Sequence, residues 1–263
     1  MQEGTRLAGR ALVMGGGGIL GIAWMLGLWA ALAEAGVELN DADLVVGTSA
    51  GSVVGSLLAY GAEPGQLAGL VQAGMGLPPA AVAKVVTGAG LTEEEWVSIF
   101  AVPLGDAPWP AKDLRISAVA EDTGEVVMWT RASGVPIARA VAASCAVPNL
   151  LPPVTIDGRR YIDGGARSGT HADQALGCER VLIIAPMGGP RYVLGHEMLA
   201  RERARLEAAG IRVMTVLPDA ATERVFAENL MEIARAFDAL EAGRRQGEGA
   251  AAAVRAFWSR AAG

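Results

Sequence analysis

The sequence predicts an α/β fold of three layers, in which helices cover both faces of a central, mainly parallel sheet. The chain opens in the order strand, glycine-rich turn, helix, strand, turn and helix, which is typical of a parallel sheet. Its 263 residues are 52% hydrophobic and 19% charged, so a full core can form without disulfides. We expect one domain over residues 1–263, with its core at about 10–186 and a C-terminal strand and helices at 190–263.

The first elements are short apolar runs that end at glycines. Residues 10–14 form a buried strand that leads into four consecutive glycines, and a helix follows over about 19–34. The next strand covers 43–46, and the helix after it runs over about 52–60. Each of the two strands therefore ends at a glycine-containing turn that leads into a helix.

The region 62–110 has a different character from the rest of the chain. It combines short helical pieces with proline and glycine, and Thr92 to Glu95 form a capping box that opens a helix toward Phe100. We interpret it as a helical insertion that is either a lid or a set of ordinary connecting helices. The remaining elements are hairpins at 114–130 and 156–162, strands at 180–185 and 212–217, and helices at 136–146, 195–209, 222–240 and within 246–263.

Composition excludes several classes of protein. The net charge of −6 argues against a nucleic-acid partner, and two distant cysteines, Cys145 and Cys178, supply neither a disulfide framework nor a structural zinc site. Residues 12–32 are apolar, but glycines interrupt them, and the uninterrupted part is shorter than the roughly 20 residues of a membrane span. The first residues lack a secretory signal pattern. We expect a soluble cytoplasmic protein and leave peripheral membrane contact open.

The motif Gly47-Thr48-Ser49-Ala50-Gly51 lies between a predicted strand and a predicted helix. A sharp turn there presents a serine hydroxyl, and the glycines two residues before and after Ser49 let the backbone turn without clashes. The start of the following helix favours developing negative charge. Ser49 is therefore a candidate nucleophile, and the alternative is an ordinary serine in a tight turn.

The glycine-rich segment Gly15–Gly21 permits two functional interpretations. Residues 16–21 satisfy GxGxxG, the dinucleotide fingerprint, but that fold needs an acidic residue at the end of the next strand. Asp41 and Asp43 instead lie at the opposite end of that strand, where it begins. The second interpretation is an oxyanion hole, whose N–H groups face an intermediate formed on Ser49. A tight turn without function would need fewer glycines.

Asp163-Gly164-Gly165 follows the second hairpin. On such an exposed turn, Asp163 could accept the Ser49 proton, or it could merely cap local N–H groups. His171 and His196 are alternative bases, because they complete the Ser…Asp…His order of α/β-hydrolases. That fold places several strands before the nucleophile strand, whereas one precedes it here, so neither histidine is favoured.

Together, the segments 15–21, 47–51 and 163–165 resemble the motifs of the patatin-like phospholipase family. The stretches 143–148 and 158–163 are similar in kind, and the resemblance covers roughly residues 10–186. It implies a patatin-like fold and a Ser49–Asp163 dyad. It also implies oxyanion donors and supporting glycines, which are the N–H groups of Gly16, Gly17 and Gly18, and Gly15, Gly21, Gly47, Gly51, Gly164 and Gly165.

The resemblance implies a serine acyl-ester hydrolase of the phospholipase A type that acts on lipids, with no metal and no cofactor. Many members carry a basic residue just before the last glycine of the loop, where this chain has Leu20. An acyl channel could be lined by apolar residues of the insertion, namely Leu77, Val82, Val85, Val86, Trp96 and Phe100. The alternative is a non-catalytic protein that binds a nucleotide or acyl ligand on the Gly15–Gly21 loop.

Overall fold

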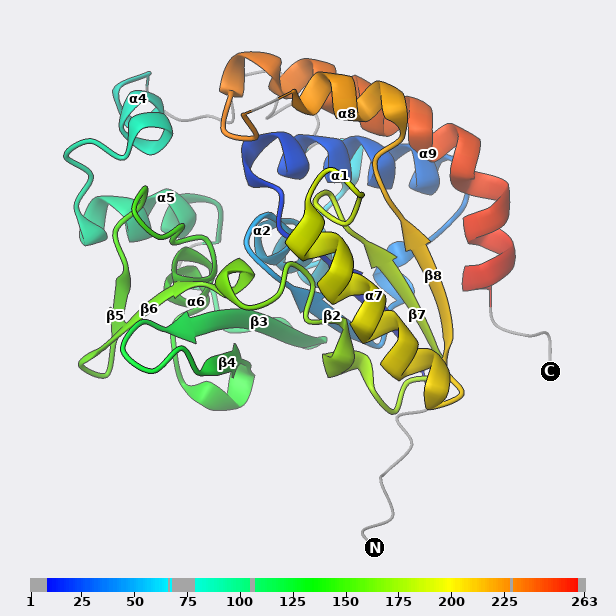
Figure 1. The fold of residues 1–263 in the computed structure, drawn as a ribbon, viewed down its shortest axis with the longest axis horizontal. Coiled ribbons are helices and arrows are strands. Elements are labelled where there is room, and N and C mark those ends of the chain that lie inside the picture. Colours follow the sequence, from blue (N-terminus) through cyan, green and yellow to red (C-terminus); the bar gives the residue numbers. More distant parts are fainter. Residues whose placement is uncertain (1–8, 66, 68–78, 105–106, 228, 260–263) are drawn as a thin grey trace, which may run out of the picture.

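One sheet contains all eight strands in the part of the chain that the computed structural model describes, which is residues 9–65, 67, 79–104, 107–227 and 229–259. Seven strands follow the order β5-β6-β3-β2-β1-β7-β8, and β4 pairs with β3 (Figure 1). The strands are β1 (Arg10–Met14), β2 (Leu44–Gly47), β3 (Asp113–Ala120), β4 (Val126–Trp129), β5 (Val154–Ile156), β6 (Arg159–Asp163), β7 (Arg180–Ile184) and β8 (Arg212–Val216).

The sheet has a parallel half and an antiparallel half. β3, β2, β1, β7 and β8 are parallel neighbours. The two predicted hairpins supply the other half, because β4 and β6 run antiparallel to β3, and β5 runs antiparallel to β6. The predicted α/β fold with a mainly parallel sheet is confirmed, and the hairpins make the sheet mixed.

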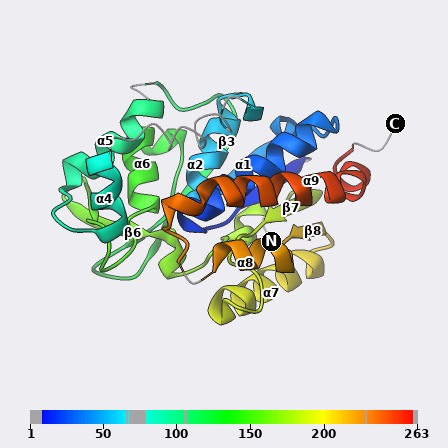
Figure 2. The same ribbon diagram turned by 90° about the horizontal axis from the view of Figure 1, so that it is seen from above.

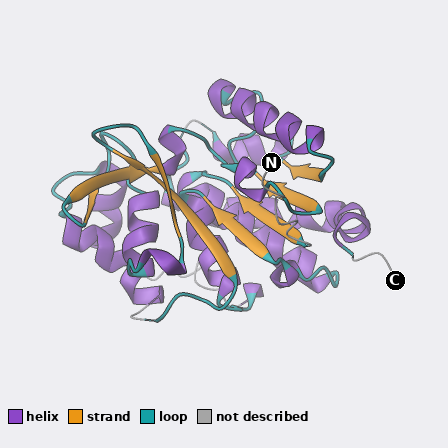
Figure 3. Ribbon diagram, turned by 90° about the horizontal axis from the view of Figure 1, so that it is seen from below, coloured by secondary structure: helices purple, strands orange, loops and turns teal. Residues whose placement is uncertain are grey.

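Helices cover both faces of the sheet. In β1, Leu12 and Met14 belong to one buried cluster with the residues of α1, while Ala11 and Val13 belong to a second cluster with Leu199 of α7. Figure 1 shows α7 in front of β7 and β8, and Figure 3 shows the strands running between helices. The helices are α1 (Gly18–Glu34), α2 (Ala50–Ala59), α4 (Pro79–Thr87), α5 (Glu93–Leu104), α6 (Ile137–Ser144), α7 (Val193–Ala208), α8 (Ala220–Phe226) and α9 (Ala236–Trp258).

The long helix α9 lies along α1 (Figure 2). Glycines at the contact let the two backbones approach closely. A Cβ atom at Gly27 would collide with the carbonyl oxygen of Leu240, and one at Gly243 would collide with that of Trp24. This pairing ties the C-terminal part of the chain to the helix that follows the glycine-rich loop.

The predicted helix over 222–240 is wrong. α8 ends at Phe226, Ala227 adopts a φ of 43°, and α9 begins only at Ala236. Phe226 packs edge-on against Trp24 with 6.3 Å between ring centroids, and α9 contacts α1 independently. These two tertiary anchors set the break, which helix propensity did not reveal. The predicted final helix is the C-terminal half of α9.

The insertion contains α4 and α5 in its described part. The predicted capping box is confirmed, because the Glu95 carboxylate accepts the Thr92 N–H at 3.0 Å and the Thr92 hydroxyl accepts the Glu95 N–H at 3.2 Å. Residues 66, 68–78, 105 and 106, among them Leu77, lie outside the described residues. The role of a lid stays a prediction.

Candidate active site

Strand register brings the chain at Ser49 and Asp163 to the same level of the sheet. Gly47, the last residue of β2, pairs with Ile116 of β3, and Ser49 follows two residues later. On the other side of β3, Asp163 at the end of β6 pairs with Ala118. Because Ala118 is two residues beyond Ile116, the two chain segments approach each other across β3.

Ser49 lies in a sharp turn between β2 and α2. Its φ of 52° and ψ of −120° are rarely adopted by residues other than glycine, and such strain costs of order 1–3 kcal/mol. The flanking glycines make the turn sterically feasible. A Cβ atom at Gly51 would collide with the carbonyl oxygen of Met14, and one at Gly47 would lie 2.6 Å from the Cα atom of Ser52.

Asp163 is almost fully buried, with 5% of its surface exposed. Burial raises the pKa of its carboxyl group to about 6, while the nearby Ser49 side chain and a hydrogen bond from the Gly165 N–H oppose that rise. The bond from Gly165 measures 2.7 Å. Gly164 fits tightly against Ser117 of β3. The result is a buried carboxylate beside the serine side chain, with its pKa raised above the ordinary value.

The last residue of α6 and the residues just after it hold both Ser49 and Asp163 by their backbones. The Ser144 hydroxyl accepts the Ser49 N–H at 2.9 Å, and the Ala146 carbonyl accepts the Asp163 N–H at 2.9 Å. Between them, the Cys145 thiol lies 3.7 Å from the Ser52 hydroxyl, and burial raises its pKa. The sequence marked this stretch as similar to a family motif but indicated no role for Ser144.

The first two glycines of the loop are held by neighbouring backbone. The Gly15 N–H donates to the Ile184 carbonyl and the Gly16 N–H donates to the Gly169 carbonyl, each at 2.9 Å. Of the three expected oxyanion donors, the one at Gly16 is therefore occupied in this structure.

The next N–H groups are free. Those of Gly17 and Gly18 have no hydrogen-bond acceptor among the residues that the structure describes, and the same is true of Ala50 at the start of α2. Gly18 opens α1 with a φ of 58°. Gly17 and Gly21 both approach Pro186, which leaves no room for larger side chains at Gly17. The sequence did not single out Ala50, although its place after the candidate nucleophile could have suggested it.

Ser49, Asp163 and the glycine loop line one cavity of about 570 Å³. Its wall is otherwise mostly apolar and comes from α1, α2, α4, α5, α7 and the segments beside them. The apolar side chains are Ile19, Ile22, Val53, Val85, Trp96, Ile99, Phe100, Val147, Leu151, Met187, Leu194, Met198, Leu230, Met231 and Ile233. An apolar cavity with a few convergent polar groups is the usual form of a small-molecule site.

Part of the predicted acyl channel lies in this wall. Val85, Trp96 and Phe100 line the cavity, whereas Val86 packs beside the core without lining it. The side chain of Val82 lies outside the described part of the chain. The walls from α7 and from 230–233 carried no sequence motif.

Neither histidine contacts the Ser49–Asp163 pair. The Nε2 atom of His171 lies 3.1 Å from the Gly164 carbonyl oxygen, and the Nδ1 atom of His196 lies 2.8 Å from the Gly188 carbonyl oxygen. Both rings are therefore hydrogen-bonded to backbone.

The acidic residues that a dinucleotide site would need lie far from the glycine loop along the sheet. Asp43 precedes β2 and accepts the Arg10 N–H at 2.8 Å, and the Asp41 carboxylate lies 3.4 Å from the Arg10 guanidinium. Within the described ranges, no cluster of three or more His, Cys, Asp or Glu side chains is placed to hold a metal ion.

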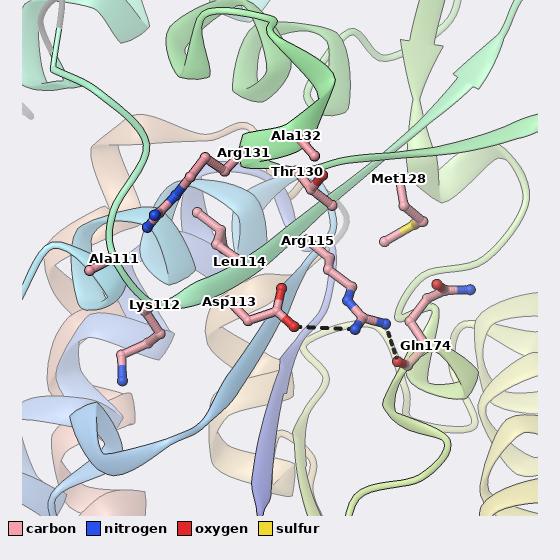
Figure 4. Close-up of a pocket in the computed structure, with 10 residues that line it drawn as sticks. All are labelled: Ala111, Lys112, Asp113, Leu114, Arg115, Met128, Thr130, Arg131, Ala132 and Gln174. Carbon is pink, nitrogen blue, oxygen red and sulfur yellow. Dashed lines mark hydrogen bonds and ion pairs between the residues drawn. The ribbon is translucent and has the colours of Figure 1, made fainter. Parts of the chain in front are cut away.

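A second cavity of about 500 Å³ lies at the opposite, amino-terminal end of the parallel strands. Figure 4 shows Arg115 reaching both Asp113 and Gln174, at 3.2 Å and 2.9 Å. Lys112 and Arg131 donate to backbone carbonyls. Its cationic groups are thus engaged within the protein, and none of the predicted site residues lines it.

The chain belongs to the patatin-like phospholipase family. The sequence profile described as patatin-like phospholipase matches residues 12–73 and 97–176, which together make up more than half of the chain. Membership places the protein among the lipid acyl hydrolases. No helix in the described part of the chain has the length and apolar character of a membrane span.

A comparison with solved structures found two proteins that match most of this chain at low sequence identity. VipD from Legionella pneumophila is 14% identical, with a TM-score of 0.45, and the match covers 93% of this chain and 67% of VipD. The type III effector protein ExoU is 16% identical, with a TM-score of 0.40, and the match covers 92% of this chain and 53% of ExoU. A comparison with curated protein sequences gave no significant match.

Ser144→Ala should destabilise the protein, because it leaves the buried N–H of the strained Ser49 without an acceptor. We expect a loss of about 1–3 kcal/mol in the free energy of unfolding, measured by urea denaturation. The control is Ser98→Ala, which removes an exposed hydroxyl that donates to a helix carbonyl. Equal stability of the Ser144 variant and the wild type would contradict the proposed backbone support.

Proposed function

We propose that this protein is a serine acyl-ester hydrolase of the phospholipase A type, with Ser49 as nucleophile and Asp163 as general base. One observation carries the proposal: the Ser49 side chain lies beside a buried carboxylate on the same cavity wall, and the pKa of that carboxylate is raised to about 6. A base works best when its pKa lies near the operating pH, and burial supplies that shift without a histidine. The apolar cavity suits the acyl chain of a lipid.

Acylation begins when Asp163 takes the hydroxyl proton while the Ser49 Oγ atom attacks the carbonyl carbon of the ester. The oxygen of the tetrahedral intermediate becomes negatively charged, and the free N–H groups of Gly17 and Gly18 are proposed to stabilise it. The Ala50 N–H is a further candidate donor. The bond between the acyl carbon and the leaving alkoxide oxygen then breaks, and that oxygen receives the proton from Asp163, so that the alcohol leaves. The acyl group remains on Ser49.

Deacylation repeats these steps with water. Asp163 accepts a proton from a water molecule, whose oxygen attacks the acyl carbon, and the same N–H groups stabilise the second intermediate. The bond to the Ser49 Oγ atom then breaks, Asp163 returns its proton to that oxygen, and the fatty acid leaves. The carboxylate acts as base and acid alternately, so the proposed cycle needs no third side chain.

Ser49→Ala should reduce turnover of a p-nitrophenyl acyl ester by at least about a thousandfold, because no other group can form the acyl-enzyme. A fluorophosphonate probe, which reacts with activated serines, should label the wild type and Ser98→Ala but not Ser49→Ala, as measured by mass spectrometry. A wild type that neither turns over esters nor takes up the probe would contradict the proposal and favour non-catalytic ligand binding at the glycine loop.

Asp163 must be ionised to act as a base, so kcat/KM should rise with pH and level off above a midpoint of about 6. Asp163→Asn should lose at least about a hundredfold and show no such midpoint. A variant that keeps the same pH dependence would assign the titration to another group.

Asp163→Asn should also stabilise the fold at high pH. The folded pKa of about 6 lies above the ordinary value of 3.8, so ionising Asp163 costs the folded state of order 2–3 kcal/mol. This cost is absent below about pH 4 and complete above about pH 6. Urea unfolding should therefore show a gain for Asp163→Asn at pH 8 and none at pH 4.

The matched control for this measurement is Asp122→Asn, because the Asp122 carboxylate is exposed and pairs with Arg159. It should gain no stability at pH 8. A loss of stability in Asp163→Asn at pH 8 would show that ionising Asp163 does not cost the folded state free energy.

A further inference from the structure

We propose that Glu202 of α7 is a positioning residue for this reaction, because it holds the loop 164–172 that connects Asp163 to the glycine loop. The inference rests on the proposed function, since it concerns the same hydrolytic site. It assigns a role to a helix that lies outside the segments 12–73 and 97–176 matched by the family profile.

The Glu202 carboxylate accepts three hydrogen bonds from this loop. They come from the Ser168 hydroxyl at 2.5 Å, the Thr170 hydroxyl at 2.5 Å and the Ala172 N–H at 2.9 Å. All three donors are neutral, and Glu202 forms no ion pair within the described part of the chain. Its charge is thus used to bind the loop rather than a neighbouring cation.

The orientation of the Ser168 hydroxyl depends on Glu202. Its oxygen already accepts the N–H groups of Thr170 at 3.2 Å and His171 at 3.0 Å, so both lone pairs are occupied. Its proton therefore has to go to an acceptor, and that acceptor is Glu202. An amide at residue 202 cannot accept from Ser168, Thr170 and Ala172 together, because one of its two polar atoms is a donor.

Through its residues 169–171, the loop 164–172 contacts both the glycine loop and the residue that follows Asp163. The Gly169 carbonyl, between the two bound hydroxyls, accepts the Gly16 N–H at 2.9 Å and so fixes the backbone just before the free N–H groups of Gly17 and Gly18. The His171 ring lies 3.1 Å from the Gly164 carbonyl, directly after Asp163. One carboxylate therefore stabilises the segments that carry the proposed donors and the proposed base.

A loss of this support should affect the transition state more than substrate binding. The oxyanion exists only after Ser49 has attacked, so small displacements of its donors lower kcat and leave KM nearly unchanged. Loss of a whole oxyanion donor costs about a hundredfold to a thousandfold. A displaced donor retains part of its effect, so we expect a smaller loss.

The test compares Glu202→Gln with Glu207→Gln, a matched change on the same helix at an exposed pair with Arg203. For Glu202→Gln we expect kcat on a p-nitrophenyl acyl ester to fall at least about tenfold, with KM within about twofold. Fluorophosphonate labelling of Ser49 should slow in parallel. The midpoint of the pH profile should remain, and Glu207→Gln should behave as the wild type.

An unchanged kcat, or an equal loss in Glu207→Gln, would overturn the inference. Should Glu202→Gln fail to fold, Thr170→Val removes one of the three bonds and should lower kcat alone by a smaller factor. If the wild type is active and Glu202→Gln has the same kcat, only this inference is contradicted. If the wild type neither hydrolyses the ester nor reacts with the probe, the proposed function is contradicted.

Discussion

The proximity of the Ser49 side chain to the buried Asp163 carboxylate is the constraint on which the proposed site depends. Burial alone would favour the neutral acid, and the nearby Ser49 side chain and the bond from the Gly165 N–H limit the rise of its pKa to about 6. Two features of this site cost free energy: the Asp163 carboxylate is removed from water, and the backbone at Ser49 is strained. The surrounding structure has to compensate for both.

The mixed sheet explains how such a contact forms. The parallel strands β1 and β2 end in the glycine loop and the serine turn, while β6 enters from the antiparallel half and ends in Asp163. Each turn is then tied by its backbone to a distant segment: Ser49 to Ser144, Asp163 to Ala146, and the glycine loop to Gly169. Apolar side chains, most of them from the surrounding helices, line the rest of the cavity around Ser49 and Asp163.

Local sequence predicted the strands, most helices and the three motifs, because each depends on residues close together in the chain. It did not predict contacts made by tertiary packing. The Ser49–Ser144 bond spans 95 residues, and the bonds of Glu202 arise only when α7 docks on the sheet. The break after Phe226 likewise follows from its packing against Trp24, not from helix propensity. The glycine loop was expected to offer three donors, but the loop 164–172 places the Gly169 carbonyl against the first of them.

The most direct test is a titration of the Asp163 carboxyl group itself by ¹³C NMR, in the wild type and in Ser49→Ala. We predict a pKa of about 6 in the wild type and a higher value in the variant, because the hydroxyl that favours the ionised form is gone. A wild-type value near the ordinary 3.8, or a value that does not respond to loss of the hydroxyl, would contradict the coupling of these two side chains.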